Sequence, residues 1–445
     1  MEFFERPKVG ERAVLVHVNF HDKDAREDLD ELKELALSAG ADPVAVIQAS
    51  RRGPDSKYFV GVGKAEEIRL AVVDSEAELV IFNHVLSPSQ ERNLERLLCC
   101  RVLDRTGLIL DIFAQRAHTF EGKLQVELAQ LRHLSTRLVR GWTHLERQGG
   151  GIGLRGPGET QLETDRRLIA QRIMQLNKRL EKVSQQREER RRSRRKSLVK
   201  TVSLVGYTNA GKSTLFNSLT QAEAYVADQL FATLDPTLRK FDLKFEHDTV
   251  LIDTVGFIRH LPHKLVAAFR STLEETQEAN ILLHVIDAYT EGRQERIVEV
   301  NAVLKEVGAD EVFQLEVYNK IDLIGDSEPH IDRDDDGRPL RVWISAATKA
   351  GLELLRQAVT ECLQWQYAQS RGEVITWKES MIKHRYQLLL TPMAGRLHTD
   401  LFRAGVIETE SHTEQGGWLL EVNLSPRQKE AYCRQEGCVC LNETS

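Results

Sequence analysis

The chain has 445 residues, a formal net charge of −6 and six cysteines. This length predicts about three domains, each large enough to bury its own core. No apolar run approaches the roughly 18 residues that suggest a membrane-spanning helix, and Met1–Phe20 lacks the pattern of a secretory leader, so we expect a cytoplasmic protein. The cysteines show neither a disulfide framework nor a complete zinc motif, which favours free thiols.

Residues 1–120 alternate between short apolar runs typical of strands and amphipathic stretches typical of helices. This pattern predicts a small N-terminal α/β domain. The expected strands are Ala13–Val18, Pro43–Gln48, Leu79–Phe82 and Val102–Leu103, with helices up to Ala39, over Ala65–Val73 and over Ser89–Leu98. Gly61-Val62-Gly63-Lys64 resembles a phosphate loop but lacks the spacing and the Ser/Thr, so we interpret it as a strand-to-helix turn.

Residues 121–198 carry leucines and isoleucines at the spacing of a coiled-coil seam, which predicts an antiparallel helical hairpin. The seam positions are Leu124, Leu128, Leu131 and Leu138 in the first helix and Leu162, Ile169, Ile173, Leu176, Leu180 and Val183 in the second. Gln148–Gly158 is too rich in glycine to be helical, and it is either a plain linker or a tip that probes RNA. Thr160 and Glu163 have capping-box spacing for the second helix.

The second helix of this hairpin is strongly basic. Arg166–Lys200 contains fourteen Lys/Arg and three Glu, a local charge of +11. Charged runs are usually solvated helix faces. Arg190–Lys196, however, is too one-signed for pairing between side chains four residues apart, so residues 187–196 favour an RNA partner.

Residues 199–365 carry the motifs of a nucleotide-binding domain. The apolar run Val202–Val205 leads into Gly206-Tyr-Thr-Asn-Ala-Gly-Lys-Ser213, the pattern of a phosphate-binding loop between a strand and a helix. Lys212 should reach the β- and γ-phosphates, and Ser213 should bind Mg²⁺. This domain should be built on a mostly parallel sheet, with an acidic, turn-rich insertion around Asp332–Pro339.

Three further segments follow in the order expected of a guanine-nucleotide site. Val250–Ile252 ends in Asp253-Thr-Val-Gly256, which predicts that Asp253 holds Mg²⁺ through water and that the Gly256 N–H approaches the γ-phosphate. Asn319-Lys320-Ile-Asp322 selects the base, because the Asp322 carboxylate accepts from an edge that guanine has and adenine lacks. Ser345-Ala346 should place a backbone N–H on guanine O6. We assign to the nucleotide Gly206, Tyr207, Thr208, Asn209, Ala210, Gly211, Lys212, Ser213, Thr214, Asp253, Gly256, Asn319, Lys320, Asp322, Ser345 and Ala346.

Residues 366–445 again alternate between stretches typical of strands and of helices. This pattern predicts a small α/β C-terminal domain whose chemistry is not readable from its residues.

The chain resembles the HflX family, within the Obg/HflX class of GTPases. The resemblance rests on four segments and is most specific at the glycine-rich one: residues 206–214, 231–237 (FATLDPT), 253–258 (DTVGFI) and 149–164 (GGGIGLRGPGETQLET). It spans roughly residues 10–365. It implies a GTP hydrolase that binds the large ribosomal subunit and its rRNA through the hairpin and separates or rescues ribosomes under stress. The alternative is an RNA-modification or other RNA-linked regulatory GTPase, for which no catalytic cysteine motif or flavin or folate site is evident.

The resemblance also suggests roles at the reacting phosphate. Thr233, or else Thr237, should close over Mg²⁺ and the γ-phosphate, which makes Lys212, Thr233 and Gly256 the expected catalytic set. Phe257 stands where Ras-like enzymes carry the glutamine that positions water, so we expect slow basal hydrolysis that rises on the ribosome. Asn209 occupies the position that binds K⁺ in potassium-activated GTPases, although it could instead only stabilise the loop. We expect a monomer.

Overall fold

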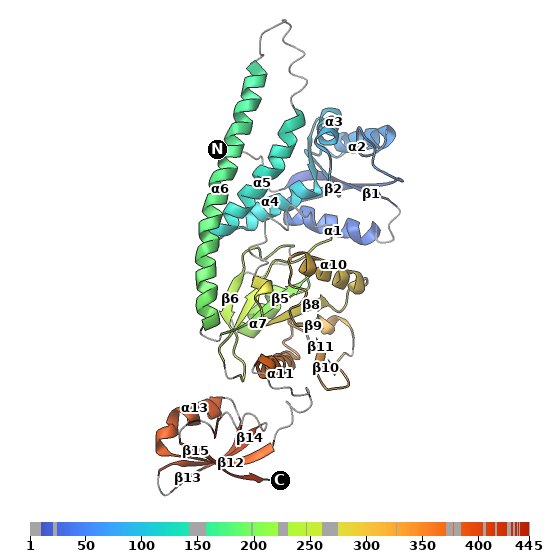
Figure 1. Ribbon diagram of the computed structural model, residues 1–445. Helices are drawn as coiled ribbons and strands as arrows, with labels where there is room; N and C mark the ends of the chain where they lie inside the picture. The colour runs from blue at the N-terminus through green and yellow to red at the C-terminus, as the bar shows by residue number, and fades with distance from the viewer. Residues whose placement is uncertain are drawn as a thin grey trace. The chain divides into compact units, whose positions relative to one another are not determined.

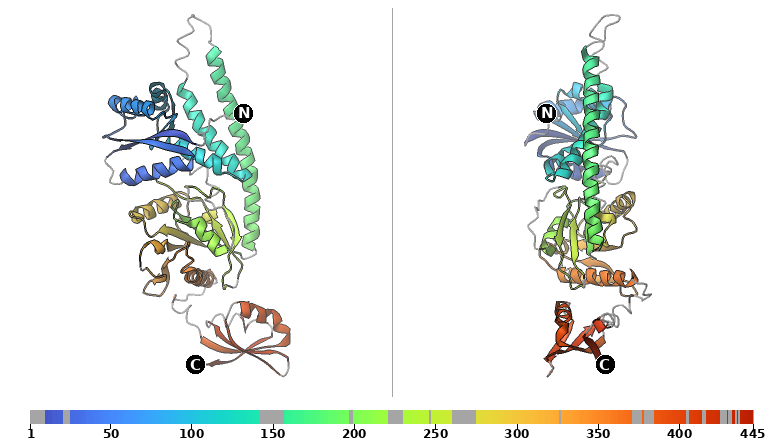
Figure 2. Two further views of the ribbon diagram at one scale, coloured as in Figure 1. Left: turned by 180° about the vertical axis from the view of Figure 1, so that it is seen from behind. Right: turned by 60° about the vertical axis from the view of Figure 1, so that its left-hand side comes forward.

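The computed structural model forms two compact units, each of which draws on more than one stretch of chain (Figures 1 and 2). One comprises residues 1–193 with 225–236 and 254–274, and the other comprises residues 194–224, 237–253 and 275–445. The residues that the structure describes are 10–20, 25–141, 157–196, 199–220, 230–245, 247–259, 275–325, 327–370, 377, 384–403, 406–413, 416–424, 429, 432–433, 435 and 437–444.

The first unit contains a four-stranded, fully parallel sheet with strand order β2-β1-β3-β4. The strands are β1 (Glu11–Asn19), β2 (Ala41–Ser50), β3 (Leu79–Phe82) and β4 (Arg101–Asp104), and the helices are α1 (Ala25–Ser38), α2 (Val62–Asp74), α3 (Pro88–Leu98) and α4 (Arg105–Arg116). α2 and α3 cover one face, where Val16, Val80 and Phe82 pack against Ile68 and Leu94. The expected strands and three helices of this region are therefore present. α4 was not expected from the sequence.

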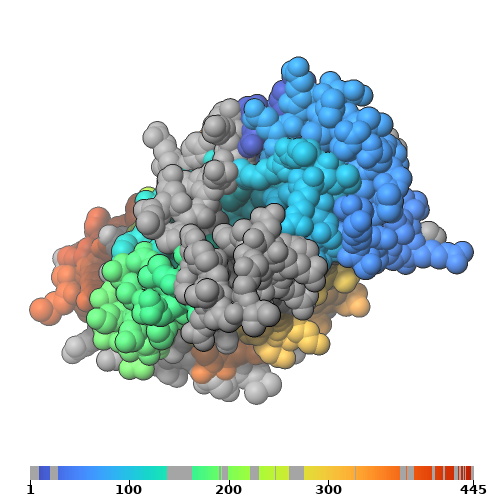
Figure 3. Space-filling model, turned by 90° about the horizontal axis from the view of Figure 1, so that it is seen from above, coloured from blue at the N-terminus to red at the C-terminus, as the bar shows by residue number. Residues whose placement is uncertain are grey.

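α5 (Phe120–Gly141) and α6 (Pro157–Lys196) run side by side along the predicted seam (Figures 1 and 2). Leu124, Leu128, Leu131, Ile169 and Leu176 form one buried cluster, with Leu134, Ile173 and Leu180 packed against it. The hairpin prediction is therefore confirmed. In the space-filling view of Figure 3, residues of the N-terminal α/β region appear in blue and cyan, and residues of α6 appear in green.

The second helix of the hairpin begins earlier than the sequence suggested. Because α6 starts at Pro157, Thr160 lies within its first turn and the predicted capping box at Thr160 is wrong. Pro157 and Gly158 are helical as well, whereas the rest of the glycine-rich run lies outside the described residues.

The second unit is built on a seven-stranded sheet with strand order β10-β11-β9-β8-β5-β7-β6. Five central strands are parallel, and β6 and β10 add antiparallel edges. The strands are β5 (Lys200–Gly206), β6 (Thr237–Lys240), β7 (Thr249–Asp253), β8 (Ile281–Asp287), β9 (Gln314–Asn319), β10 (His330–Arg333) and β11 (Pro339–Trp343). The helices are α7 (Lys212–Thr220), α10 (Arg293–Glu306), η2 (Ile321–Leu323) and α11 (Leu352–Ser370).

The expected acidic insertion at 332–339 is in part the β10–β11 hairpin, because Asp332 pairs with Arg341 across the two strands. The C-terminal residues form an antiparallel sheet of order β13-β14-β12-β15, with α13 (Gly395–Arg403) and η3 (Pro392–Ala394) contributing to its core. Its strands are β12 (His384–Leu390), β13 (Ile407–His412), β14 (Trp418–Leu424) and β15 (Cys438–Thr444). The predicted α/β fold class is confirmed, with a mostly parallel sheet in the nucleotide domain.

Candidate guanine-nucleotide site

The phosphate loop joins the end of β5 to the start of α7. Gly206 has φ +144 and Gly211 has φ +90, so both adopt backbone conformations that side chains rarely allow. A Cβ at Gly206 would overlap the Val285 carbonyl oxygen of β8, and a Cβ at Gly211 would overlap the Asn319 amide. Both glycines are thus required by the packing of neighbouring strands as well as by the turn. Asn209 also lies in the left-handed region, with φ +59.

Lys212 is buried beneath this loop. Its Nζ donates to the carbonyl oxygens of Gly206 at 3.0 Å and Tyr207 at 2.6 Å. Burial lowers the pKa of Lys212 to about 8, and the Asp253 carboxylate partly opposes that shift. The lysine is therefore desolvated in advance, which strengthens its attraction for a phosphate oxygen.

His284 on β8 lies close enough to Lys212 for its titration to be affected. Burial, and then the Lys212 charge, lower the pKa of His284 to about 4, so its imidazole is neutral at pH 7. Sequence reasoning missed this residue. Its only signal was a single polar side chain inside the apolar run Ile281–Ile286.

Ser213 and Asp253 converge from α7 and the carboxyl end of β7. Ser213 Oγ donates to Asp253 Oδ2 at 2.9 Å, and the Asp253 side chain is almost fully buried. A hydroxyl and a carboxylate in this position are the oxygen donors that Mg²⁺ prefers in phosphoryl-transfer sites. The residues present therefore fit the metal.

Asn319 connects the phosphate loop to the turn that follows β11. Its Nδ2 donates to the Ala210 carbonyl at 2.9 Å, and its Oδ1 accepts from the Ala346 N–H at 2.9 Å. The Ser345 N–H donates to the Ala350 carbonyl. Both amides of the Ser345-Ala346 pair thus have partners here, so the expected contact to guanine O6 would have to share or replace the bond to Asn319 and stays a prediction.

The residues predicted to select the base lie just beyond β9. Lys320 adopts φ +68, and its Nζ donates to Asp287 Oδ2 at 2.8 Å, which holds the start of η2 next to the end of β8. Asp322 lies in η2 and is exposed. Both positions are compatible with the predicted base site, since they follow the carboxyl ends of parallel strands.

Two further positions of the phosphate loop have distinct surroundings. The Tyr207 ring is buried beneath the Arg296 guanidinium, which lies 4.9 Å from its centroid. The Thr208 hydroxyl is buried and has no hydrogen-bond partner among the described residues. An unsatisfied buried hydroxyl is costly unless a ligand meets it, so Thr208 fits a loop that closes around phosphate.

The residues predicted to act near the γ-phosphate belong to both compact units. Thr237 begins β6 and pairs with Asp253, so it is part of the sheet. Thr233 lies outside any strand or helix, and Thr233, Gly256 and the buried Phe257 belong to segments that cluster with the first unit.

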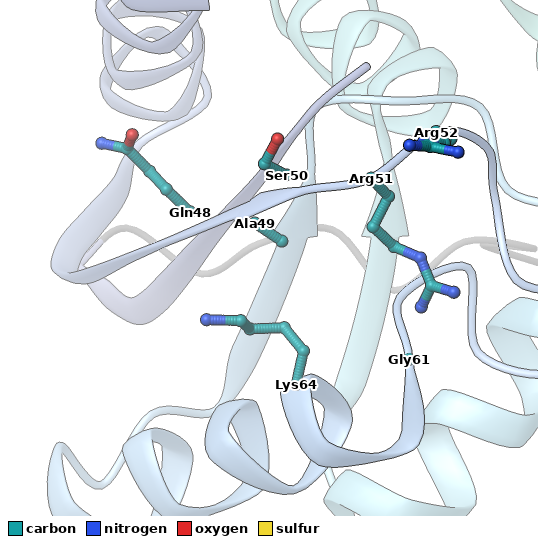
Figure 4. A pocket seen from close by; sticks show the side chains of 7 residues that line it. All are labelled: Gln48, Ala49, Ser50, Arg51, Arg52, Gly61 and Lys64. Carbon is teal, nitrogen blue, oxygen red and sulfur yellow. The ribbon is translucent and has the colours of Figure 1, made fainter. Parts of the chain in front are cut away.

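Gly61-Val62-Gly63-Lys64 lies outside this site. Gly61 precedes α2, and the segment borders a surface hollow of about 610 Å³ lined also by Arg51 and Arg52 (Figure 4). A Cβ at Gly61 would meet the Arg51 guanidinium, so the glycine makes room for that side chain.

Comparison with known proteins agrees with this geometry. Residues 26–114, 116–194 and 201–320 match family models described as GTP-binding GTPase N-terminal, GTP-binding GTPase middle region and 50S ribosome-binding GTPase. GTPase HflX of Escherichia coli (strain K12) is 58% identical over 433 residues, which cover 97% of this chain and 98% of the relative. The chain belongs to the HflX family of GTPases. The resemblance noted from its motifs is thereby confirmed, and the chain is a GTP hydrolase that binds guanine nucleotides.

A second HflX relative is less similar but still aligns over most of both chains. GTPase HflX of Caldanaerobacter subterraneus subsp. tengcongensis is 46% identical over 392 residues, covering 84% of this chain and 89% of the relative. Among solved structures, the SsGBP and GDP complex is 25% identical, covers 82% of this chain and 100% of its own, and aligns with a TM-score of 0.46. In the part of this HflX-family chain that the structure describes, every helix is too short or too polar to cross a bilayer.

Proposed function

We propose that this GTPase binds the large ribosomal subunit and separates or rescues ribosomes under stress. The observation that carries the proposal is the match of residues 201–320 to a family described as 50S ribosome-binding GTPase, in a chain that aligns with almost the full length of an HflX relative. The basic second helix of the hairpin supports a partner rich in phosphate.

In the proposed cycle, the Lys212 ammonium binds the β- and γ-phosphates, and the loop amides between Gly206 and Ser213 surround them. Ser213 and, through water, Asp253 would hold Mg²⁺, which would neutralise charge that develops on the phosphate oxygens. Thr233 is the better candidate than Thr237 for closing over the metal, because Thr237 is tied into β6 by its pairing with Asp253.

Hydrolysis by the isolated protein should be slow. Phe257 has no group that could orient water by a hydrogen bond, so the proposed stimulation by the ribosome supplies that positioning. We also propose that Asn209 binds K⁺, which would place positive charge near the transferred phosphate. Comparing GTP turnover in K⁺ and Na⁺ at equal ionic strength, in the parent and in Asn209→Ala, tests this role. Equal turnover in both salts would indicate that Asn209 only stabilises the phosphate loop and does not bind K⁺.

The basic run of α6 is the proposed contact with rRNA. Among the side chains of this run that the structure describes, Arg187 pairs with Glu121 at 2.9 Å and Arg192 pairs with Glu188 at 3.4 Å. The expectation that the run is too one-signed for pairing is therefore wrong at Arg192. That side chain is still 71% exposed, and exposed pairs contribute little energy, so a phosphate could compete for it.

Sedimentation with ribosomal subunits tests the function. The parent should pellet with large subunits in a non-hydrolysable GTP analogue and much less in GDP. Asp322→Asn should transfer this dependence to the matching xanthosine analogue, because the side-chain amide donates where the carboxylate accepted. Co-sedimentation that ignores the nucleotide would contradict the proposal, and stable binding to a free RNA in place of subunits would favour the alternative of an RNA-modification or regulatory GTPase.

A matched pair of variants tests the basic run. Replacing Arg190, Arg191, Arg192, Arg194 and Arg195 by Gln should weaken subunit binding and lower the log–log salt slope by roughly 0.7–0.9 for each lost phosphate contact. The control removes the same charge from five exposed basic residues nearer the N-terminus of α6, namely Arg166, Arg167, Lys178, Arg179 and Lys182. Equal salt slopes for the two variants would indicate that residues 190–195 form an ordinary solvated helix face and make no specific contact with rRNA.

A further inference from the structure

The segment that carries Thr233 is fixed to the N-terminal half of the chain at three points, all within the first compact unit. The Leu230 N–H donates to Ser38 Oγ at 3.1 Å at the end of α1. The Phe231 ring packs edge-on against Phe113 of α4, with centroids 4.7 Å apart. Phe231 has φ +57, a conformation costly for a bulky residue, so these contacts must offset backbone strain.

The third point is the carboxylate of Asp235, which lies at the N-terminus of α5. Asp235 Oδ2 accepts from the N–H groups of His118 at 3.0 Å and Thr119 at 2.8 Å, and Oδ1 accepts from the Thr119 hydroxyl at 2.5 Å. The same hydroxyl accepts from the Gly122 N–H at 3.0 Å, and the Thr119 carbonyl accepts from the Lys123 N–H. Thr119 is therefore the N-cap of α5, and Gly122 is the third residue of the helix.

This arrangement is a capping box in which one member comes from a distant segment. In an ordinary capping box, a Glu or Gln at the third helical position accepts from the N-cap N–H. Here that position is Gly122, and the carboxylate belongs to Asp235, 116 residues farther along the chain from Thr119. A Cβ at Gly122 would overlap Asp235 Oδ1, so the glycine leaves the space that the incoming carboxylate fills. The negative charge also interacts favourably with the helix dipole.

We propose that Asp235 makes the cap of α5 dependent on the bound nucleotide. The segment that carries Thr233 and Asp235, called switch I below, supplies the cap in the GDP state and withdraws it when Thr233 closes over the γ-phosphate. The inference rests on the role proposed for Thr233. Asp235 is two residues away, so the chain between them spans at most about 7 Å. In the proposed closed switch, Thr233 binds the metal together with Ser213 and Asp253, whereas the observed hydrogen bonds hold Asp235 at the N-terminus of α5. We therefore expect the cap and the closed switch to compete for one short segment. The stability of the N-terminus of α5 then depends on which of the two forms.

Thermodynamic linkage gives this competition two measurable consequences. If GTP opens the cap, then loss of the cap must favour GTP by the same factor. Asp235→Ala should therefore raise the ratio of GTP-analogue affinity to GDP affinity. A single charged cap near a helix end corresponds to a change of roughly tenfold in an equilibrium constant.

The test is amide hydrogen exchange of the full-length protein without ribosomes, in GDP and in a non-hydrolysable GTP analogue. In the parent, the amides of His118 and Thr119 should exchange roughly tenfold faster in the analogue than in GDP. In Asp235→Ala they should exchange fast in both states, and Asp235→Asn should be intermediate because its amide oxygen still accepts. Identical exchange of these amides in the two states of the parent would overturn the proposal, as would a persisting difference in Asp235→Ala.

Glu121→Gln is the matched control. It removes a carboxylate from the same helix end, one that pairs with Arg187 instead of with switch I, so the nucleotide-dependent difference should remain. Loss of the difference in Glu121→Gln would mean that any weakening of α5 suffices, and would overturn the specific role of Asp235. Since no ribosome is present, an exchange difference in a chain that fails to bind subunits would count against the proposed function alone.

Discussion

Asn319→Ala should disconnect the phosphate loop from the Ser345-Ala346 turn that follows β11. Asn319 is 2% exposed, and its amide makes one hydrogen bond of 2.9 Å to each of Ala210 and Ala346. Truncation removes two buried hydrogen bonds at about 1 kcal/mol each and leaves a carbonyl and an N–H unsatisfied, so a total near 3 kcal/mol is expected. Affinity for GDP should fall by up to roughly 100-fold, because both loops belong to the proposed nucleotide site.

Fluorescent-GDP titration measures the affinity, and hydrogen exchange of β5 measures the local stability of the sheet without assuming that the whole chain unfolds in one step. Asn319→Asp separates the two bonds, since it keeps the acceptor for Ala346 but places a carboxylate oxygen against the Ala210 carbonyl. It should bind GDP at least as poorly as the alanine variant. The control Asn423→Ala loses only an exposed side-chain bond of 3.4 Å to Glu408. GDP affinity of Asn319→Ala within threefold of the parent would refute the argument.

Three further changes test the site. Gly206→Ala should abolish GDP binding because its Cβ would overlap the Val285 carbonyl. The control Gly325→Ala is also at positive φ but has open space around it, so it should retain binding. Equal GDP affinity of the two variants would contradict the packing argument. Phosphate binding should restore the ordinary pKa of Lys212, so GDP affinity should be flat below pH 8 and fall by up to tenfold per pH unit above it, in titrations between pH 7 and 9; a flat profile throughout would show that the lysine stays charged when unliganded. Ser213→Ala should bind the GTP analogue with much less dependence on Mg²⁺ in titrations with and without a chelator, and an unchanged dependence would remove Ser213 from the metal site.

The sequence determined those features whose cause is local. A glycine turn between an apolar strand and a helix can form only a few structures, so Gly206–Ser213 was recognisable as a phosphate loop before any contact was known. The seam of the hairpin followed from residue spacing in the same way, because helical periodicity places Leu124, Leu128 and Leu131 on one face. α4 was missed because almost all of its first nine residues are buried, which removes the polar face that marks an amphipathic helix.

Only the tertiary structure decided which distant groups meet. Nothing near Asn319 in the sequence indicates that its amide spans from Ala210 to Ala346, and nothing near Thr119 indicates that Asp235 completes its cap. Such bonds depend on where the packed sheet and helices bring unpaired donors and acceptors, and short-range periodicity carries no information about separations of this length. The sequence therefore determined the chemistry of the site, while the packing of distant segments decided what holds its loops in place.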